Sequence, residues 1–424
     1  MDLEVELNST NPDYVVYVPK HLGEPKGDSG NEHFLVFDGP DGSLMAVWTQ
    51  STFEGMADPR IVFSRSDNEG ESWSEPVVIA AEDPETGNGM ASWAFPMVSH
   101  SGRIYVLYSR HIGVNDYGTT ITGLMGGIYS DDNGETWSRE QRVPMRRSVW
   151  DNPDPDIPAN WIVWQKPLRL SEGKYYAGFT RWVSTAVKAE NPYGRWTGDA
   201  SVTEFMRFEN IDDDPEVGDI ELQFFMKDHD ALQVSLPDHP EVSVVHEPTI
   251  VPLPDGRLFC VVRTMTGCPY WTVSDDAGFT WQAPEPLRQF DGGPIFQHPL
   301  SPCPMYCVDE GEYFFLFHNH DGHFEEWTPQ DTSWHRRPIY VAHGQFRPDA
   351  HQPVWFADPV FLMDNTGNKI GYGRGRTDLA MYDSVTIRNG MPVLWYPERK
   401  FFLLGKKMPM DWLAEMVVRK VGSV

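Results

Sequence analysis

Polar side chains recur at matching distances from six glycines of this 424-residue chain. Each glycine belongs to a turn signal followed by an apolar run of strand length, as in PDGSLMAVW and PDGRLFCVV. Four arginines in six equivalent places suit the binding of a carboxylate or sulfate, because a guanidinium presents a planar fork of donors. We therefore predict that an anionic ligand is bound by the residues seven or eight positions beyond each glycine: Gln50, Arg110, Arg181, Arg263, Asn319 and Arg374.

A second set of residues stands nine positions before the same glycines. Its tryptophans suit stacking on the C–H faces of sugars, and its carboxyl groups suit acid–base chemistry on a glycosidic bond. We expect both sets to lie at the strand ends away from the turns, around one carbohydrate pocket. The members of this second set are His33, Trp93, Trp164, Glu247, Pro302 and Asp358.

The hairpins themselves predict the architecture. An apolar run precedes each turn as well as following it, and the turns recur every 55 to 83 residues, which is typical of blades of four short strands. We predict an all-β, six-bladed β-propeller with four-stranded antiparallel blades, forming one domain over residues 1–424. A seventh blade stays open, since the interval from Gly173 to Gly256 is long and contains the acidic loop NIDDDPEVGD. The tail MPMDWLAEMVVRK predicts a short C-terminal helix that packs on the outside or closes the ring. The turn glycines are Gly42, Gly102, Gly173, Gly256, Gly311 and Gly367.

Composition excludes some partners. The formal charge of −28 opposes binding to nucleic acid or to an anionic membrane, because like charges repel. No apolar stretch reaches the length of a membrane span, and MDLEVELNST lacks the basic start and apolar run of a signal peptide. We expect a soluble protein, either cytoplasmic or secreted with its leader already removed. The four cysteines are too few for a disulfide scaffold, and we expect free thiols.

A second repeated motif is more specific. SDNEGESW, SDDNGETW and SDDAGFTW, which begin at Ser66, Ser130 and Ser274, follow the pattern S-x-D-x-G-x-T-W, with Asn68 in the Asp position of the first copy. This is the Asp-box, and the chain resembles the sialidases and their relatives, which are propellers of four-stranded blades. The resemblance implies that the boxes are structural: local side-chain hydrogen bonds close a tight turn, and the Trp packs between blades.

The resemblance extends to single residues in three stretches. HEPTIVPLPDGRLFCVVR resembles the sialidase segment whose glutamate polarises a tyrosine nucleophile, and Glu247 matches that glutamate. DTSWHRRPIYVAHG resembles the strand with a substrate-binding arginine, which places it at Arg336 or Arg337. In GMADPRIVFSRSDNEGESW, Asp58 falls near the general acid.

The chain also departs from the sialidase pattern. Sialidases open their first inner strand with Arg-Ile-Pro, whereas this chain reads Glu32-His33-Phe34, and GCPYW lacks the arginine expected before the third box. Two of the three arginines that clamp the sialic acid carboxylate are therefore missing from their expected places. We expect a protein that retains the sialidase scaffold but has a different acidic oligosaccharide or polysaccharide as its substrate.

Two kinds of catalysis and one non-catalytic function remain open. An exo-acting glycoside hydrolase would use two carboxyl groups, chosen from Asp58, Glu247, Glu32 and Asp358. A polysaccharide lyase would remove the proton beside a uronate carboxyl with a His or Tyr base, and several sialidase-like propellers are lyases on glycans of rhamnose and glucuronate. The third possibility is a sugar-binding propeller without catalysis. The histidines available to a lyase are His33, His246, His318, His320 and His323.

The run HNHDGH offers one alternative. His318 and His320 project to the same side of a strand, so the run could hold a structural metal ion. Apart from that possibility, the sequence predicts no cofactor.

Overall fold

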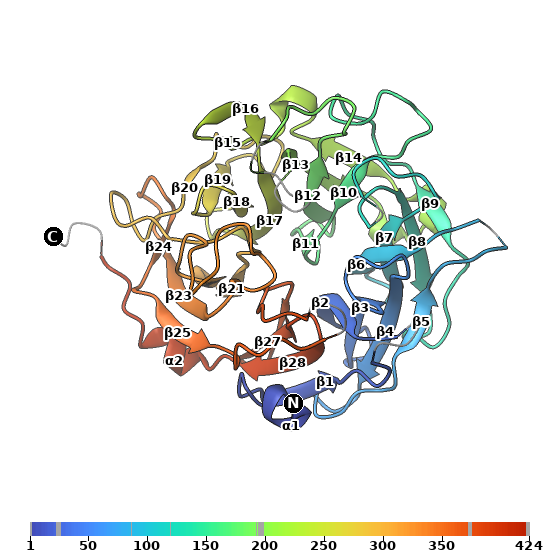
Figure 1. Ribbon diagram of the computed structural model, residues 1–424, viewed down its shortest axis with the longest axis horizontal. Helices are drawn as coiled ribbons and strands as arrows, with labels where there is room; N and C mark the ends of the chain where they lie inside the picture. The colour runs from blue at the N-terminus through green and yellow to red at the C-terminus, as the bar shows by residue number, and fades with distance from the viewer. Residues whose placement is uncertain are drawn as a thin grey trace.

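The computed structural model describes residues 2–22, 27–85, 87–118, 120–191, 193, 199–371 and 375–420. Within these ranges, six antiparallel sheets stand around a central axis like the blades of a propeller, as Figure 1 shows. The prediction of an all-β, six-bladed propeller is confirmed, and no seventh blade forms among the described residues.

Three of the blades are regular, and in each the chain runs outward from the axis through four strands. Their strands are continuous apolar runs because both faces of a blade are covered by its neighbours. The first blade consists of β2 (Gly30–Asp38), β3 (Leu44–Ser51), β4 (Arg60–Ser66) and β5 (Val77–Ala80). The second consists of β6 (Ala91–Val98), β7 (Ile104–Arg110), β8 (Leu124–Ser130) and β9 (Gln141–Val143). The fourth consists of β17 (Val245–Pro252), β18 (Leu258–Thr264), β19 (Tyr270–Ser274) and β20 (Glu285–Pro286).

The third and fifth blades each have one strand position split in two. In the third blade both inner strands pair with β12, and in the fifth blade both outer strands pair with β23. The third blade consists of β10 (Asn160–Ile162), β11 (Leu168–Arg169), β12 (Tyr175–Trp182), β13 (Ser201–Phe208) and β14 (Leu222–Phe225). The fifth consists of β21 (Met305–Asp309), β22 (Glu312–Phe317), β23 (Ile339–Phe346), β24 (Val354–Phe356) and β25 (Val360–Met363).

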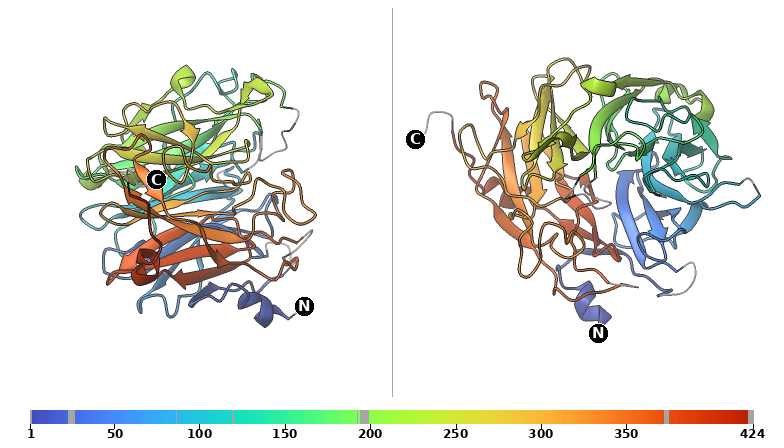
Figure 2. Two further views of the ribbon diagram at one scale, coloured as in Figure 1. Left: turned by 90° about the vertical axis from the view of Figure 1, so that its left-hand side faces the viewer. Right: turned by 45° about the horizontal axis from the view of Figure 1, so that its top comes forward.

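The sixth blade closes the ring by joining the two ends of the chain. Its three inner strands, β26 (Ser384–Arg388), β27 (Met391–Glu398) and β28 (Phe402–Lys407), come from the C-terminal part of the chain, and β1 (Tyr14–Tyr17) pairs with β28 at the outer edge. Helix α1 (Leu3–Leu7) lies beside this blade in both views of Figure 2. The ring is therefore closed by an N-terminal strand.

The predicted C-terminal helix is short and packs against the outside of the ring. It spans α2 (Met410–Ala414), and Leu413 and Met416 join the apolar cluster of the fifth and sixth blades. Neither α2 nor any other helix in the described part of the chain is long and apolar enough to cross a membrane.

The sequence misplaced the sixth hairpin. It was predicted around Gly367, but residues 364–369 form neither strand nor helix. The hairpin instead joins β26 to β27 through Asn389 and Gly390, whose φ angles are 52° and 73°. Asn-Gly suits such a turn because both residues tolerate positive φ. As a consequence Asp358 does not begin an inner strand: it is exposed between β24 and β25.

The long interval after Gly173 holds short excursions from the third and fourth blades. The acidic loop folds into two 3₁₀ turns, and Val217 packs into the core of the second and third blades. The excursions are η1 (Ile211–Asp213), η2 (Val217–Asp219), η3 (Asp228–Asp230) and the hairpin of β15 (Ser235–Leu236) and β16 (His239–Ser243).

The three S-x-D-x-G-x-T-W motifs follow the third strand of the regular blades. In the third copy, Asp276 accepts hydrogen bonds from the backbone N and the hydroxyl of Thr280, at 2.8 and 2.6 Å. Trp281 stacks on Phe205 of the preceding blade with ring centroids 4.6 Å apart. Each motif thus closes a turn and places an aromatic ring against the neighbouring blade.

Candidate active site

Three inner strands carry a β-bulge at the same place. The ladder to the next strand breaks after Glu32, Ser92 and His246, and the following residues His33, Trp93 and Glu247 have φ angles of 52°, 61° and 53°. Positive φ is uncommon for such residues and marks positions that the surrounding structure imposes.

The bulges are held by the preceding blade. The backbone N–H groups of Trp93 and Glu247 donate to the hydroxyls of Thr49 and Thr180, each at 2.8 Å. His33 and Trp93 both pack against Tyr382 at the entrance of the sixth blade. The bulges therefore bring side chains of different blades together.

Tyr382, Glu247 and Arg263 form a hydrogen-bonded group. The Tyr382 hydroxyl donates to Glu247 Oε1 at 3.0 Å, and the Arg263 guanidinium lies 2.8 Å from Glu247 Oε2 and 3.2 Å from the Tyr382 oxygen. Arg263 Nε also donates to His246 Nδ1 at 3.1 Å. A phenol with a carboxylate to receive its proton and a cation beside both atoms can act as a nucleophile or as an acid–base pair.

Burial sets the protonation of this group. It raises the pKa of Glu247 and of Tyr382, and Arg263 opposes the rise at both residues. Lys400 also lowers the pKa of Tyr382, and its Nζ lies 4.6 Å from the centre of the Tyr382 ring. Burial and the charge of Glu247 together keep the pKa of Tyr382 raised, and the cations offset this rise only in part.

A ring of uncharged aromatic groups surrounds Tyr382. The Trp93 and Trp164 rings meet it edge to face, at centroid distances of 5.7 and 6.3 Å. Burial lowers the pKa of His33 well below its usual value, so this imidazole is neutral. Among the described residues, neither ring nitrogen of His33 has a hydrogen-bond partner.

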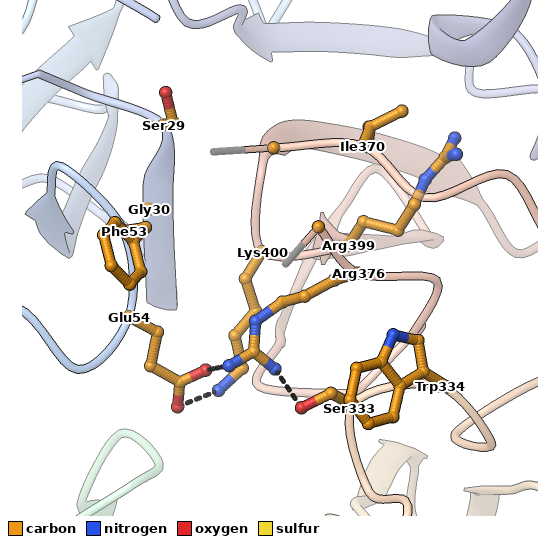
Figure 3. A pocket seen from close by; sticks show the side chains of 12 residues that line it. Ser29, Gly30, Phe53, Glu54, Ser333, Trp334, Ile370, Arg376, Arg399 and Lys400 are labelled. Carbon is orange, nitrogen blue, oxygen red and sulfur yellow. Dashed lines mark hydrogen bonds and ion pairs between the residues drawn. The ribbon is translucent and has the colours of Figure 1, made fainter. Parts of the chain in front are cut away.

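A cavity of about 380 Å³ adjoins this group at Lys400. Its floor is an ionic cluster in which Glu54 bonds Arg376 and lies 2.7 Å from Lys400 Nζ, as Figure 3 shows. Phe53 and Trp334 form apolar parts of the wall. The cavity thus offers charged and aromatic contacts of the kind that a sugar uses.

Two carboxyl groups in this region differ in protonation. Burial raises the pKa of Glu32 to about 7, although Lys400 at 3.1 Å opposes the rise. Burial alone would also raise the pKa of Glu54, but the charges of Arg376 and Lys400 outweigh burial and lower this pKa to about 2. Glu32 can therefore exchange a proton near neutral pH, whereas Glu54 stays ionised.

The predicted arginines do not share one pocket. Arg110 is bonded by Glu140 of its own blade and by the carbonyls of Ala81 and Gly89, which lie between the first and second blades. Arg181 is held by Asp151 at 2.7 Å and Glu204 at 3.0 Å. Of the set, only Arg263 contacts the tyrosine group, and Arg374 lies outside the described residues. Arg110 and Arg181 are therefore engaged by carboxylates of their own surroundings rather than open to a shared ligand.

Four further predicted residues also lie elsewhere. Gln50 is buried against Asn31 and Arg60, and Asn319 is exposed. Asp58 accepts a hydrogen bond from the Thr52 hydroxyl at 2.6 Å and so closes its own loop. Arg337 pairs with Asp364 at 2.8 Å, so it is Arg336 that lies near the site, where its charge opposes the rise in the pKa of Glu247 and of Tyr382 that burial causes.

His318 is engaged at both ring nitrogens, by the Ser301 hydroxyl and the Pro338 carbonyl. It has no free lone pair for a base or for a metal ion. Among the described residues no three His, Cys, Asp or Glu side chains are grouped to hold a metal.

Tyr382, Lys400 and Arg376 are residues of this site that the sequence did not predict. A signal for Tyr382 was present: the Asn-Gly turn at 389–390 is a strong hairpin marker, and counting back eight residues from Gly390 reaches Tyr382. The other two residues lie in loops with no repeat pattern.

The chain belongs to the family of BNR repeat-like domains, whose model matches residues 42–372. No curated protein sequence matches it. The family was predicted from the repeated motifs, and that prediction is confirmed.

Solved structures with the same fold include several sialidases. The NanB sialidase of Streptococcus pneumoniae superposes with a TM-score of 0.61 at 11% identity, covering 95% of this chain and 71% of the other. The intramolecular trans-sialidase of Ruminococcus gnavus gives 0.57 at 11%, covering 97% and 99%. A protein of unknown function from Dyadobacter fermentans gives 0.59 at 12%, covering 94% and 97%. At these identities the likeness establishes the fold, a sialidase-like propeller.

Proposed function

We propose that the chain is an exo-acting, retaining glycoside hydrolase in which Tyr382 is the nucleophile and Glu247 takes its proton. The observation that carries this proposal is the 3.0 Å hydrogen bond between the two side chains, with Arg263 in contact with both. Tyrosine nucleophiles are a known exception to the usual pair of carboxylates in glycosidases, and sialidases use one.

The reaction would proceed in two steps. As the Tyr382 proton passes to Glu247, the phenolate oxygen bonds to the anomeric carbon, while a carboxylic acid protonates the departing oxygen. Water then attacks the anomeric carbon, the same carboxylate takes its proton, and the Tyr382 oxygen leaves and is reprotonated by Glu247.

The substrate is proposed to be an acidic glycan. A neutral phenol can approach an anomeric carbon beside a carboxylate without the repulsion that a carboxylate nucleophile would meet. Arg336 supports this assignment, because among the described residues it forms no salt bridge and its hydrogen bonds go to the Leu300 carbonyl. Its guanidinium is therefore available to a substrate anion.

A polysaccharide lyase is the second candidate, and His33 favours it. A neutral imidazole that has no hydrogen-bond partner among the described residues and contacts the Tyr382 ring could remove the proton beside a uronate carboxyl, with Tyr382 protonating the leaving oxygen.

The test is incubation with a panel of acidic oligosaccharides, following reducing ends together with the ultraviolet absorbance of an unsaturated uronate. Reducing ends without absorbance are expected. Tyr382→Phe and Glu247→Gln should lower kcat/KM by roughly 10³-fold and 10²-fold or more, while His33→Gln should have less effect. New absorbance that depends on His33 would establish the lyase, and binding without turnover would indicate a non-catalytic sugar-binding propeller.

A further inference from the structure

The orientation of Arg336 depends on one backbone carbonyl. Its Nε and one terminal nitrogen donate to the oxygen of Leu300 at 3.1 and 2.8 Å, and the side chain is buried. Its own carbonyl accepts from the backbone N of Leu379 at 2.7 Å, three residues before Tyr382. The position of the Leu300 carbonyl therefore decides where the guanidinium points.

The next residue, Ser301, is clamped between two histidines. His298 Nε2 donates to the Ser301 carbonyl, and the Ser301 hydroxyl donates to His318 Nε2, both at 2.8 Å. The backbone N of His318 donates to His298 Nδ1 at 3.2 Å, and the two rings stack 5.2 Å apart at 3°. The two histidines thus hold each other as well as the serine.

The partners fix the tautomers of both rings. A carbonyl accepts only, so His298 must carry its proton on Nε2, and His318 must carry its proton on Nδ1, which donates to Pro338 O at 3.0 Å. Burial lowers the pKa of His298 to about 3 and that of His318 well below its usual value. Both rings remain neutral, which suits a permanent scaffold beside the Arg336 charge.

The clamp holds the chain on both sides of the arginine. On one side it fixes Ser301, next to the Leu300 carbonyl that Arg336 bonds. On the other, His318 bonds the carbonyl of Pro338, two residues beyond Arg336. We propose that His298, Ser301 and His318 are positioning residues that aim Arg336 at the carboxylate of the substrate. The inference rests on the proposed function and assigns His298 and His318 a role in recognition of the acidic sugar.

Ser301→Ala tests this role because it removes a single hydroxyl group, and we expect the fold to stay unchanged. For an aryl glycoside of an acidic sugar, KM should rise about tenfold with kcat within about twofold, and Ser301→Thr should restore KM. In an Arg336→Ala background the same change should have no further effect. Ser64→Ala is the matched control, since Ser64 is a buried serine whose hydroxyl bonds the carbonyl of Ser74 in the first blade. A full Ser301→Ala effect in the Arg336→Ala background would overturn the proposal, and so would an equal effect on a neutral aryl glycoside.

A second measurement does not need turnover. In full-length protein labelled with ¹⁵N-arginine, the Nε–H signal of Arg336 is identified by its loss in Arg336→Lys. It should shift or broaden in Ser301→Ala, return in Ser301→Thr and stay unchanged in Ser64→Ala. An unchanged signal in Ser301→Ala would refute the positioning role even if no glycoside is cleaved, whereas a shifted signal without turnover would leave the clamp standing and reject only the hydrolase.

Discussion

Tyr382 and Glu247 lie 135 residues apart in the chain and belong to the sixth and fourth blades, yet their side chains are joined by a hydrogen bond. Arg263 is a strand neighbour of His246, so the cation and the carboxylate come from one hairpin. Only the tyrosine has to be supplied by another blade. At the scale of residues, the hydrogen-bonded group of Tyr382, Glu247 and Arg263 therefore combines one hairpin of the fourth blade with a phenol at the entrance of the sixth.

The identity of the general acid is a prediction at the same scale. Glu32 has the raised pKa that an acid needs, whereas the sialidase resemblance points to Asp58. Glu32→Gln should slow an alkyl glycoside by roughly 10²-fold or more but spare an aryl glycoside whose leaving group needs no proton. Asp58→Asn should affect both substrates alike, and the reverse pattern would assign the acid to Asp58. Initial rates of the two variants on the two substrates distinguish Glu32 from Asp58 as the general acid.

The buried histidines predict a loss of stability in acid. Burial lowers the pKa of His298 to about 3 and that of His335 to about 4, from 6.5. Below pH 6.5 the unfolded chain binds protons that the folded protein does not, so the free energy of unfolding falls as pH falls toward 4. Each histidine should contribute on the order of 1 kcal/mol per pH unit. Urea denaturation at pH 7, 6 and 5 should give a shallower decline for His298→Gln than for the unchanged protein. The exposed His323→Gln is the control, and equal declines for all three would contradict the assignment.

At the scale of elements, the bulges do the positioning. A regular strand would alternate its side chains across the blade, but the extra residue at His33, Trp93 and Glu247 breaks this alternation. The turns of the S-x-D-x-G-x-T-W motifs lie between the third and fourth strands, at the end of the blade opposite the bulges.

The Asp-box turns should therefore affect stability and leave turnover unchanged. Asp276→Ala removes three local hydrogen bonds, to the Thr280 backbone, the Thr280 hydroxyl and Ser274. We expect a loss of about 1–2 kcal/mol in the free energy of unfolding with kcat unchanged. The adjacent, exposed Asp275→Ala should stay within about 0.5 kcal/mol. A large fall in kcat for Asp276→Ala at temperatures where it is folded would argue against a purely structural turn.

At the scale of the molecule, ring closure depends on the N-terminal segment. Glu6 of α1 is buried and bonds Arg399 at 2.8 Å, Asn368 at 2.7 Å and Thr366 at 2.5 Å. Glu6→Ala should cost about 3 kcal/mol, because it leaves the buried Arg399 with an incomplete set of partners. Denaturant unfolding measures the loss, and the exposed Glu4→Ala should show almost none. Equal effects of the two variants would mean that this contact does not help to close the ring.

The sequence by itself determined the propeller, because glycine turns between apolar runs are local and recur once per blade. It also predicted Glu247 as a site residue and placed His33 and Trp93 in register with it, since five of the six turns were located correctly. It did not identify Tyr382, because the sixth hairpin was predicted around Gly367, whereas it turns at Asn389-Gly390. Nor could it separate Arg263 from Arg110 and Arg181, which occupy the same strand position. Which arginine is held within its own blade and which reaches the tyrosine depends on the carboxylates that neighbouring strands bring near it, and only the tertiary structure decides that.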